Sequence, residues 1–281
     1  MSMVERPQDH GAARSPSVRR RASPATVLIS SFNTRARAYL ANPAELALNT
    51  ALYLIVTLAL TGLWRVAVES AGGDMVGYSA VAVVWYIATT EVAIMSLPPR
   101  VIEYESDTVT SGEIEVELLR PVHLFSFRVA RWMGHAAPKV LCCAIAGLVW
   151  AFWFGGTPEN PAALLLAAPA LVLAIFNNIV GQVGVGACSF WIRDVRGLWF
   201  VYQKLVFLLG GMLLPLEILP ASVESVAKAL PFMTMAYVPG RLASGHVEPE
   251  LLLWQLGWTV LLIAGSGALF ARGIERIRRQ P

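Results

Sequence analysis

The chain has 281 residues, of which 56% are hydrophobic and 15% are charged, and its formal net charge is +3. This composition is too apolar for an ordinary soluble domain and is typical of a protein with several membrane spans. The three cysteines lie in apolar stretches without metal-ligand spacing, so we expect no metal site and no disulfide. No lysine follows a glycine and no nucleophile–base pattern is visible, so the chain is not expected to be an enzyme or to hydrolyse nucleotides through a phosphate-binding loop.

The N-terminal region is basic and then amphipathic. Residues 1–25 are rich in arginine, proline and serine and contain little that can be buried, which predicts a disordered tail. In residues 26–42, apolar side chains such as Ile29 and Phe32 fall on one side, and Arg35 lies near the other. This pattern predicts a connecting helix at the membrane interface, ahead of the first span.

Residues 43–275 are predicted to form one all-α membrane domain. A helix needs about 20 mainly apolar residues to cross a bilayer. Six segments meet this criterion: 46–68, 76–97, 136–156, 162–190, 198–219 and 251–271. The fourth is long enough to be tilted. The fifth runs into Pro215 and Pro220, where its end should break or turn.

Arginine is unevenly distributed between the two sides of these segments. It is concentrated in the N-terminal region, in the loops after the second and fourth segments, and in the basic tail 276–281. Because basic loops are retained on the cytoplasmic side, both termini and these two loops should be cytoplasmic. The loops at 69–75, 157–161 and 215–250 should then face outward.

The largest polar island lies in the cytoplasmic loop 98–135. Six acidic side chains gather in and before its first half: Glu103, Glu105, Asp107, Glu113, Glu115 and Glu117. Leu118, Leu119, Arg120 and Pro121 follow them. We interpret this island as the place where a partner outside the membrane binds. The alternative is a solvated loop between two spans.

A new helix is predicted directly after the acidic stretch, because Pro121 suits the first turn of a helix. Apolar residues then recur at helical spacing from Val122 to Trp132, with Arg128 and Arg131 beside them. This pattern predicts a helix that lies on the membrane surface with its arginines near the lipid headgroups.

Two of the predicted spans contain polar side chains. Glu91 lies in an apolar run of the second span, where an ionisable group is costly and is a functional candidate by default. Structural pairing near the end of the span is an equally good interpretation. Asn177, Asn178 and Gln182 lie in the middle of the fourth span, beside glycines that let another helix approach. Helix packing is the favoured interpretation of these amides, and the lining of a substrate route is the alternative.

The outward segment 215–250 is neither a plain loop nor a full span. Ser222 is expected to cap a short helix, and Pro231-Phe232 to stop it. A short amphipathic element that dips back toward the outer leaflet would cover a translocation route. The alternative is an outer cap that only packs.

Several short motifs follow one another along residues 26–275, after the basic interfacial helix and the first two spans. They are Gly112, Leu118-Leu119-Arg120-Pro121, Gly210-Gly211, Pro215-Leu216, Leu219-Pro220, Leu230-Pro231-Phe232, and Tyr237-x-Pro239 with Gly245. In this order they resemble the ABC-2 type permeases, and specifically the bacterial ABC-2 family transporter proteins.

The resemblance implies a six-span transmembrane domain of the type V exporter kind, with an N-terminal interfacial helix and re-entrant outer helices. It implies a dimer of this chain with itself or with a similar permease, placed in the bacterial inner membrane. Two cytoplasmic ATPase subunits, which bind ATP and Mg²⁺, would power the transporter, and this chain would need no cofactor of its own. The first, second and fifth spans would line the route.

The resemblance also assigns roles to residues. The contact with the ATPase maps onto Glu113, Glu117, Leu118, Leu119, Arg120 and Pro121, and a smaller contact onto Arg193, Asp194 and Arg196. The outer re-entrant gate maps onto Pro215, Leu216, Pro220, Pro231 and Phe232. The sequence departs from the family pattern in one respect, because glutamates alternate with Ile114, Val116 and Leu118 as they would in a strand.

Two other classes of function compete with this interpretation. A secondary transporter or channel acting without an ATPase would be expected to contain paired intramembrane charges or inverted repeats. The sequence offers only Glu91. A membrane-embedded enzyme needs a nucleophile–base or metal cluster at one membrane face, and none is visible. An apolar route suits an amphipathic or hydrophobic substrate, and nothing predicts nucleic-acid binding.

Overall fold

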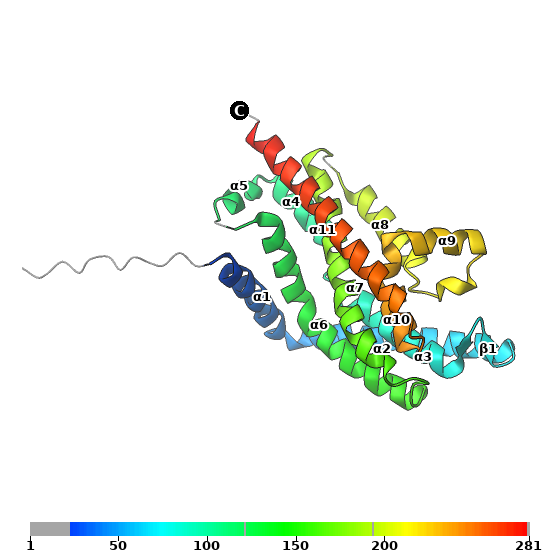
Figure 1. Ribbon diagram of the computed structural model, residues 1–281. Coiled ribbons are helices and arrows are strands. Elements are labelled where there is room, and N and C mark those ends of the chain that lie inside the picture. The colour runs from blue at the N-terminus through cyan, green and yellow to red at the C-terminus, as the bar shows by residue number, and fades with distance from the viewer. Residues whose placement is uncertain (1–22, 121, 193, 280–281) are drawn as a thin grey trace, which may run out of the picture.

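The computed structural model describes residues 23–120, 122–192 and 194–279. These residues are mostly helical, with one short hairpin of β1 (Asp74–Met75) and β2 (Tyr78–Ser79). The helices form an elongated bundle (Figure 1). Helix α5 and the end of α11 lie at one end of it, here called the C-terminal end, and the hairpin lies at the other, here called the hairpin end. Most of the predicted tail 1–25, as well as Pro121 and Arg193, falls outside the described residues.

Among the described residues, four helices are long and apolar enough to cross a membrane. They are α2 (Pro43–Ser70), α6 (Leu124–Phe154), α7 (Ala163–Gly186, continued by the 3₁₀ turn η1, Ala187–Phe190) and α11 (Pro249–Arg278). They contain the predicted first and sixth spans, and all but at most two terminal residues of the predicted third and fourth spans. α2 and α11 begin at prolines, whose missing N–H is not needed in a first turn. α7 is the most enclosed of the four, which places it at the centre of the bundle.

The predicted second and fifth spans form shorter helices, α3 (Ala80–Met95) and α8 (Arg196–Leu209). Both fall below the length of about 20 residues that a bilayer requires. The start of α3 is delayed because residues 74–79 form the hairpin. α8 ends at Leu209, ahead of the predicted break at Pro215, because Gly211 adopts φ +69°, a conformation that ends a helix. The six-span count therefore stays a prediction.

Helix α1 (Pro24–Leu40) lies in the stretch where the N-terminal helix was predicted. Ser23 caps it, because its Oγ accepts a hydrogen bond from the backbone N–H of Thr26 at 3.2 Å. The helix packs along α6 (Figure 1). The two helices approach closely at Gly134, where an added Cβ would lie 2.3 Å from the carbonyl oxygen of Phe32. Its place at the membrane interface stays a prediction.

The polar island folds into two short helices that precede α6. They are α4 (Val101–Thr110) and α5 (Glu113–Leu118), joined at Gly112, which adopts φ +78°. The strand-like alternation of this stretch does not produce a strand, and α5 is helical from Glu113. α6 begins at Leu124, after the position expected from Pro121, and runs without interruption into the predicted third span.

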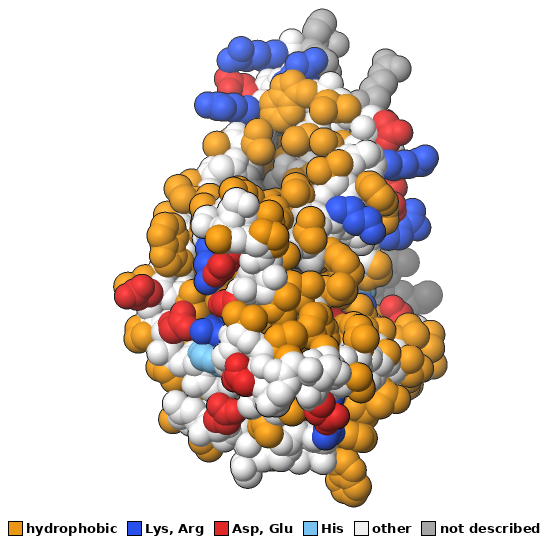
Figure 2. Space-filling view, turned by 90° about the vertical axis from the view of Figure 1, so that its right-hand side faces the viewer, with side chains coloured by type: hydrophobic (Ala, Val, Ile, Leu, Met, Phe, Trp, Pro, Cys, Tyr) orange, Lys and Arg blue, Asp and Glu red, His pale blue; other side chains and the backbone are white. Residues whose placement is uncertain are grey.

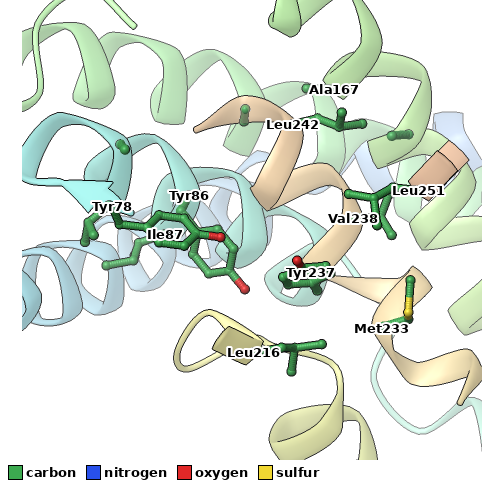
Figure 3. Close-up of a cluster of buried hydrophobic side chains, with 14 of the residues drawn as sticks. Tyr78, Tyr86, Ile87, Ala167, Leu216, Met233, Tyr237, Val238, Leu242 and Leu251 are labelled. Carbon is green, nitrogen blue, oxygen red and sulfur yellow. The ribbon is translucent and has the colours of Figure 1, made fainter. Parts of the chain in front are cut away.

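The outward segment folds back against the bundle in four short pieces. They are η2 (Leu216–Ile218), α9 (Ala221–Ala229), η3 (Pro231–Met235) and α10 (Tyr237–Ala243). α9 begins before Ser222, so Ser222 is not its cap as predicted, and it ends just before Pro231 as predicted. α10 packs on α3 and α7. Figure 3 shows the resulting apolar cluster, in which Leu216, Tyr237 and Val238 meet residues of α3 and α11.

The type of side chain on the surface changes along the length of the bundle. Figure 2 shows basic side chains gathered at the C-terminal end, a broad hydrophobic surface over the middle, and acidic side chains toward the opposite end. Large apolar side chains on α2 and α11, such as Ile55 and Leu253, are exposed. A hydrophobic middle between two polar ends is the surface that a lipid bilayer requires.

Candidate functional site

Helix α5 presents part of the predicted docking sequence at the C-terminal end of the bundle (Figure 1). Leu119, directly after the helix, is 84% exposed, and Val116 is also exposed. Glu113 and Arg120 are exposed, whereas Leu118 is half-buried. Large apolar side chains exposed beside charged ones, at a polar end of the bundle, are typical of a protein-binding surface.

The inner face of α5 holds the helix against the bundle. Ile114 is buried in a cluster with Leu124 and Phe125 of α6. A cavity of about 150 Å³ lies beside this cluster. Its lining includes Gly112 at the start of α5 and Arg276 near the end of α11. The polar island, η1 and the last helix are therefore neighbours.

A buried ion-pair network, here called the Arg128 network, connects α4, α5 and α6. The guanidinium of Arg128 is fully buried and lies 3.2 Å from a carboxylate oxygen of Glu105 and 2.5 Å from one of Glu117. Its Nη2 also donates to the hydroxyl of Thr108 at 3.2 Å. Because an unpaired charge in this position is costly, each partner depends on the others.

Further contacts surround the carboxylate of Glu105. The indole N–H of Trp132 donates to it at 3.0 Å. Burial raises the pKa of Glu105, and the guanidinium of Arg128 opposes this shift without cancelling it. Arg131 donates to the hydroxyl of Tyr104 at 2.5 Å and lies over its ring, with 4.5 Å between the guanidinium carbon and the ring centroid.

The Arg128 network differs from the sequence-based expectation. Arg128 and Arg131 were expected near lipid headgroups, but Arg128 is fully enclosed and Arg131 is mostly so. The physical reason is that acidic residues of α4 and α5 fold back over this part of α6. Glu117, expected to face a partner, instead points inward to both arginines, and its side chain is only 14% exposed.

The smaller predicted contact lies in the turn between η1 and α8. Asp194 and Arg196 are both exposed. A carboxylate oxygen of Asp194 accepts a hydrogen bond from the backbone N–H of Arg196 at 2.9 Å, which shapes the start of α8. η1 packs against α4, so this turn belongs to the same end of the bundle as α5. Arg193 and Pro121 lie outside the described residues.

The amides predicted in the fourth span form two separate sets of buried hydrogen bonds rather than one cluster. Asn177 donates to the hydroxyl of Thr234 in η3 at 3.1 Å. The carboxamide oxygen of Asn178 accepts from Gln182 at 2.9 Å and from the hydroxyl of Tyr202 on α8 at 3.2 Å. Asn177 thus connects α7 to the outward segment, and Asn178 connects α7 to α8.

Glu91 is fully buried in α3, and neither of its carboxylate oxygens has a hydrogen-bond partner within the described residues. A hydroxyl is present on the neighbouring helix, but Tyr53 of α2 donates it to the backbone carbonyl of Ala88 at 3.0 Å. A buried carboxyl group without a partner is costly in its charged form.

The predicted outer-gate residues lie at different depths. Leu216 and Pro215 are buried, Pro231 and Phe232 are half-buried, and Pro220 is exposed. Leu216 belongs to the cluster of Figure 3, where it lies below Tyr237. The ring of Phe232 packs edge-on against that of Tyr202, with 6.0 Å between the centroids.

Sequence reasoning missed a second charged cluster at the hairpin end. Glu217 accepts a hydrogen bond from the hydroxyl of Tyr237 and lies 3.4 Å from the ammonium group of Lys228. Arg241 lies 3.9 Å from Glu217 and 2.9 Å from Glu248. The signal in the sequence was that the outward segment 215–250 holds two basic residues, Lys228 and Arg241, among four glutamates.

The electrostatics of this cluster favour a charged carboxylate. Burial alone would raise the pKa of Glu217, but the hydrogen bond from Tyr237 and two nearby basic side chains hold it below its usual range. The cluster links η2, α9 and α10, and it therefore fixes the outward segment as a unit.

Together these features describe a helical protein with several helices able to cross a membrane, a partner-type surface at one end and a folded-back segment at the other. Residues 46–280 match the family model described as ABC-2 family transporter protein. The chain therefore belongs to the ABC-2 transporter family, which confirms the resemblance in its motifs, and it is a multi-pass membrane component of a transporter. No curated protein matches it with significant similarity.

Proposed function

We propose that the chain is the permease subunit of an ATP-driven exporter in the bacterial inner membrane. Two copies, or this chain and a similar permease, form the translocation pathway, and two separate ATPase subunits bind ATP and Mg²⁺. Six crossings are completed by the shorter helices α3 and α8, and the C-terminal end of the bundle is cytoplasmic. The observation that carries the proposal is the exposed tip of α5, which the Arg128 network holds against α6.

The form of α5 suits a coupling element. Leu119, Val116 and Arg120 are exposed and available to a groove on a partner. Behind them, the Arg128 network holds α5 and α4 to α6, a single helix that continues through the membrane domain. When an ATPase pair closes on nucleotide and pushes α5, the displacement reaches α6 as a rigid movement and shifts an inward–outward equilibrium.

The direct test begins with copurification. The tagged full-length chain is purified from its host, the retained ATPase is identified by mass spectrometry, and its ATP turnover is measured in vesicles. We expect Leu119→Asp to lower the retained ATPase about tenfold, as is typical for an apolar anchor at an interface. We expect Arg120→Glu to leave the chain inserted while ATP turnover no longer drives transport.

The matched control is Val226→Asp. Val226 is also an exposed apolar side chain on a short helix, but it lies on α9 in the outward segment. This variant should retain the ATPase as the wild type does. Normal ATPase retention and transport with Leu119→Asp and Arg120→Glu would show that α5 is not the coupling element.

A second function, a secondary transporter or channel without an ATPase, is favoured by one observation. Glu91 is buried and unpartnered within the described residues, as expected of a proton-carrying carboxyl. The test measures solute flux in vesicles that contain only this chain and no nucleotide. Flux under these conditions that is lost in Glu91→Gln would replace the exporter proposal with this one.

A further inference from the structure

A cavity of about 520 Å³ opens between α2, α3, α6, α7 and α8. Its size lies within the range of sites that hold a drug-sized molecule, roughly 300–1,000 Å³. Part of its wall is apolar, with Ile94 and Met95 of α3 and Trp199 and Phe207 of α8. An alkyl chain finds hydrophobic contact on this part of the wall.

The polar part of the wall is basic. Lys139 of α6, Lys204 of α8 and Arg100 line the cavity, and no described residue of the lining is acidic. Arg100 is paired with Glu103, so its charge is already offset. Lys139 and Lys204 form no ion pair with any carboxylate in the described part of the chain.

Lys139 lies in an environment where the lack of an ion pair is especially costly. Its side chain is only 4% exposed, although an ammonium group without a counter-charge is costly inside a helical bundle. The ring of Tyr39 on α1 lies beside it, with the ammonium nitrogen 5.2 Å from the centroid. Glu45 is close enough for its charge to act on Lys139, but it forms no ion pair with it and does not line the cavity.

Asn178 adds a hydrogen-bond donor to the same wall. Its carboxamide oxygen already accepts from Gln182 and Tyr202, which fixes the orientation of the amide. Its amide nitrogen is buried and has no acceptor within the described residues. A buried donor without a partner is a group that a ligand oxygen satisfies.

We propose that this cavity binds an amphipathic molecule with an anionic phosphate-type headgroup. Lys139, Lys204 and the amide nitrogen of Asn178 hold the headgroup, and the apolar wall holds one alkyl chain. The proposal rests on the proposed function only in treating such a molecule as cargo, because the binding itself requires no ATPase. The occupant is either a transported single-chain phosphate ester or an anionic phospholipid of the membrane.

The test measures binding to the purified full-length chain in a non-ionic detergent by isothermal titration calorimetry. The probes are dodecyl phosphate, the net-neutral dodecylphosphocholine, and inorganic phosphate. We expect dodecyl phosphate to bind about tenfold more tightly than dodecylphosphocholine, and inorganic phosphate to bind weakly because it lacks the chain. Equal affinity for the two amphiphiles would overturn the proposal.

Lys204→Gln is the principal variant, because Lys204 is exposed and its loss leaves the helix core intact. It should weaken dodecyl phosphate binding about tenfold and leave dodecylphosphocholine binding unchanged. Lys139→Gln should act in the same direction, and Lys228→Gln, in the outward segment, is the control with wild-type binding. A wild-type preference for dodecyl phosphate in both cavity variants would contradict the assignment.

A competition experiment separates the two sources of the headgroup. The chain is placed in nanodiscs of phosphatidylcholine, and phosphatidylglycerol is then added. Displacement of dodecyl phosphate, absent in Lys204→Gln, identifies a membrane phospholipid as the occupant, and binding without displacement identifies a single-chain cargo. All of these measurements are made without an ATPase, so a failure of the coupling proposal and a failure of this one give different results.

Discussion

At the scale of single residues, the buried charges of the Arg128 network make it sensitive to substitution. Arg128→Met leaves Glu105, which is 2% exposed, without its buried counter-charge. Removal of one partner of a buried pair costs about 3–5 kcal/mol. We therefore expect a large fall in the midpoint of thermal unfolding in detergent.

Two further variants make this prediction specific. The double variant Arg128→Met with Glu105→Gln should be more stable than Arg128→Met alone. Both charges of the pair are then removed, so Glu105 no longer leaves a buried charge without a partner. Arg279→Met removes an exposed pair with Glu275 and should change the midpoint little. An unchanged midpoint in Arg128→Met alone would mean that the network does not stabilise the fold.

At the scale of elements, the close approach of α7 and α11 gives a separate prediction. An added Cβ at Gly184 would lie 2.2 Å from the hydroxyl oxygen and 2.8 Å from the Cβ of Ser266. Gly184→Leu must therefore push α11 away from α7, and the cost of such overpacking is about 1–3 kcal/mol. Gly265→Leu is the control on α11, because no neighbouring atom of the described residues lies within 4 Å of its added Cβ. The measurement is the midpoint of thermal unfolding in detergent. An equal change of this midpoint in both variants would contradict the prediction.

The elements also show what the sequence can predict. The four long spans follow from hydrophobic length alone, and each predicted segment extends at most two residues beyond the observed helix or its 3₁₀ continuation. The end of α8 could not be placed, because apolar residues continue past Leu209 and the helix stops only where Gly211 takes a positive φ. The local pattern in α5 indicated a strand, but Glu113–Leu118 forms a helix whose Ile114 is buried against α6.

At the scale of the whole molecule, the two charged clusters were the least predictable features. The acidic residues near Glu117 were visible as a run of like charge, but their partners lie on α6 and are brought together only by folding. The cluster at Glu217 depends in the same way on contacts between η2 and α10. A charge run in a sequence shows where polar residues are, and the fold decides whether they face water, a partner or one another.

The last prediction concerns the direction in which the bundle crosses the membrane. Basic side chains gather at its C-terminal end (Figure 2), and the positive-inside rule then places this end in the cytoplasm. In a background with the native cysteines replaced by alanine, we introduce single cysteines at exposed positions: Ser111→Cys, Arg279→Cys, Thr157→Cys and Ser222→Cys. A membrane-impermeant maleimide added to intact cells should label Thr157→Cys and Ser222→Cys, and should label the other two only after the cells are permeabilised. Labelling of Ser111→Cys in intact cells would place α5 outside the cell, where no cytoplasmic ATPase can reach it, and the exporter proposal would fail with it.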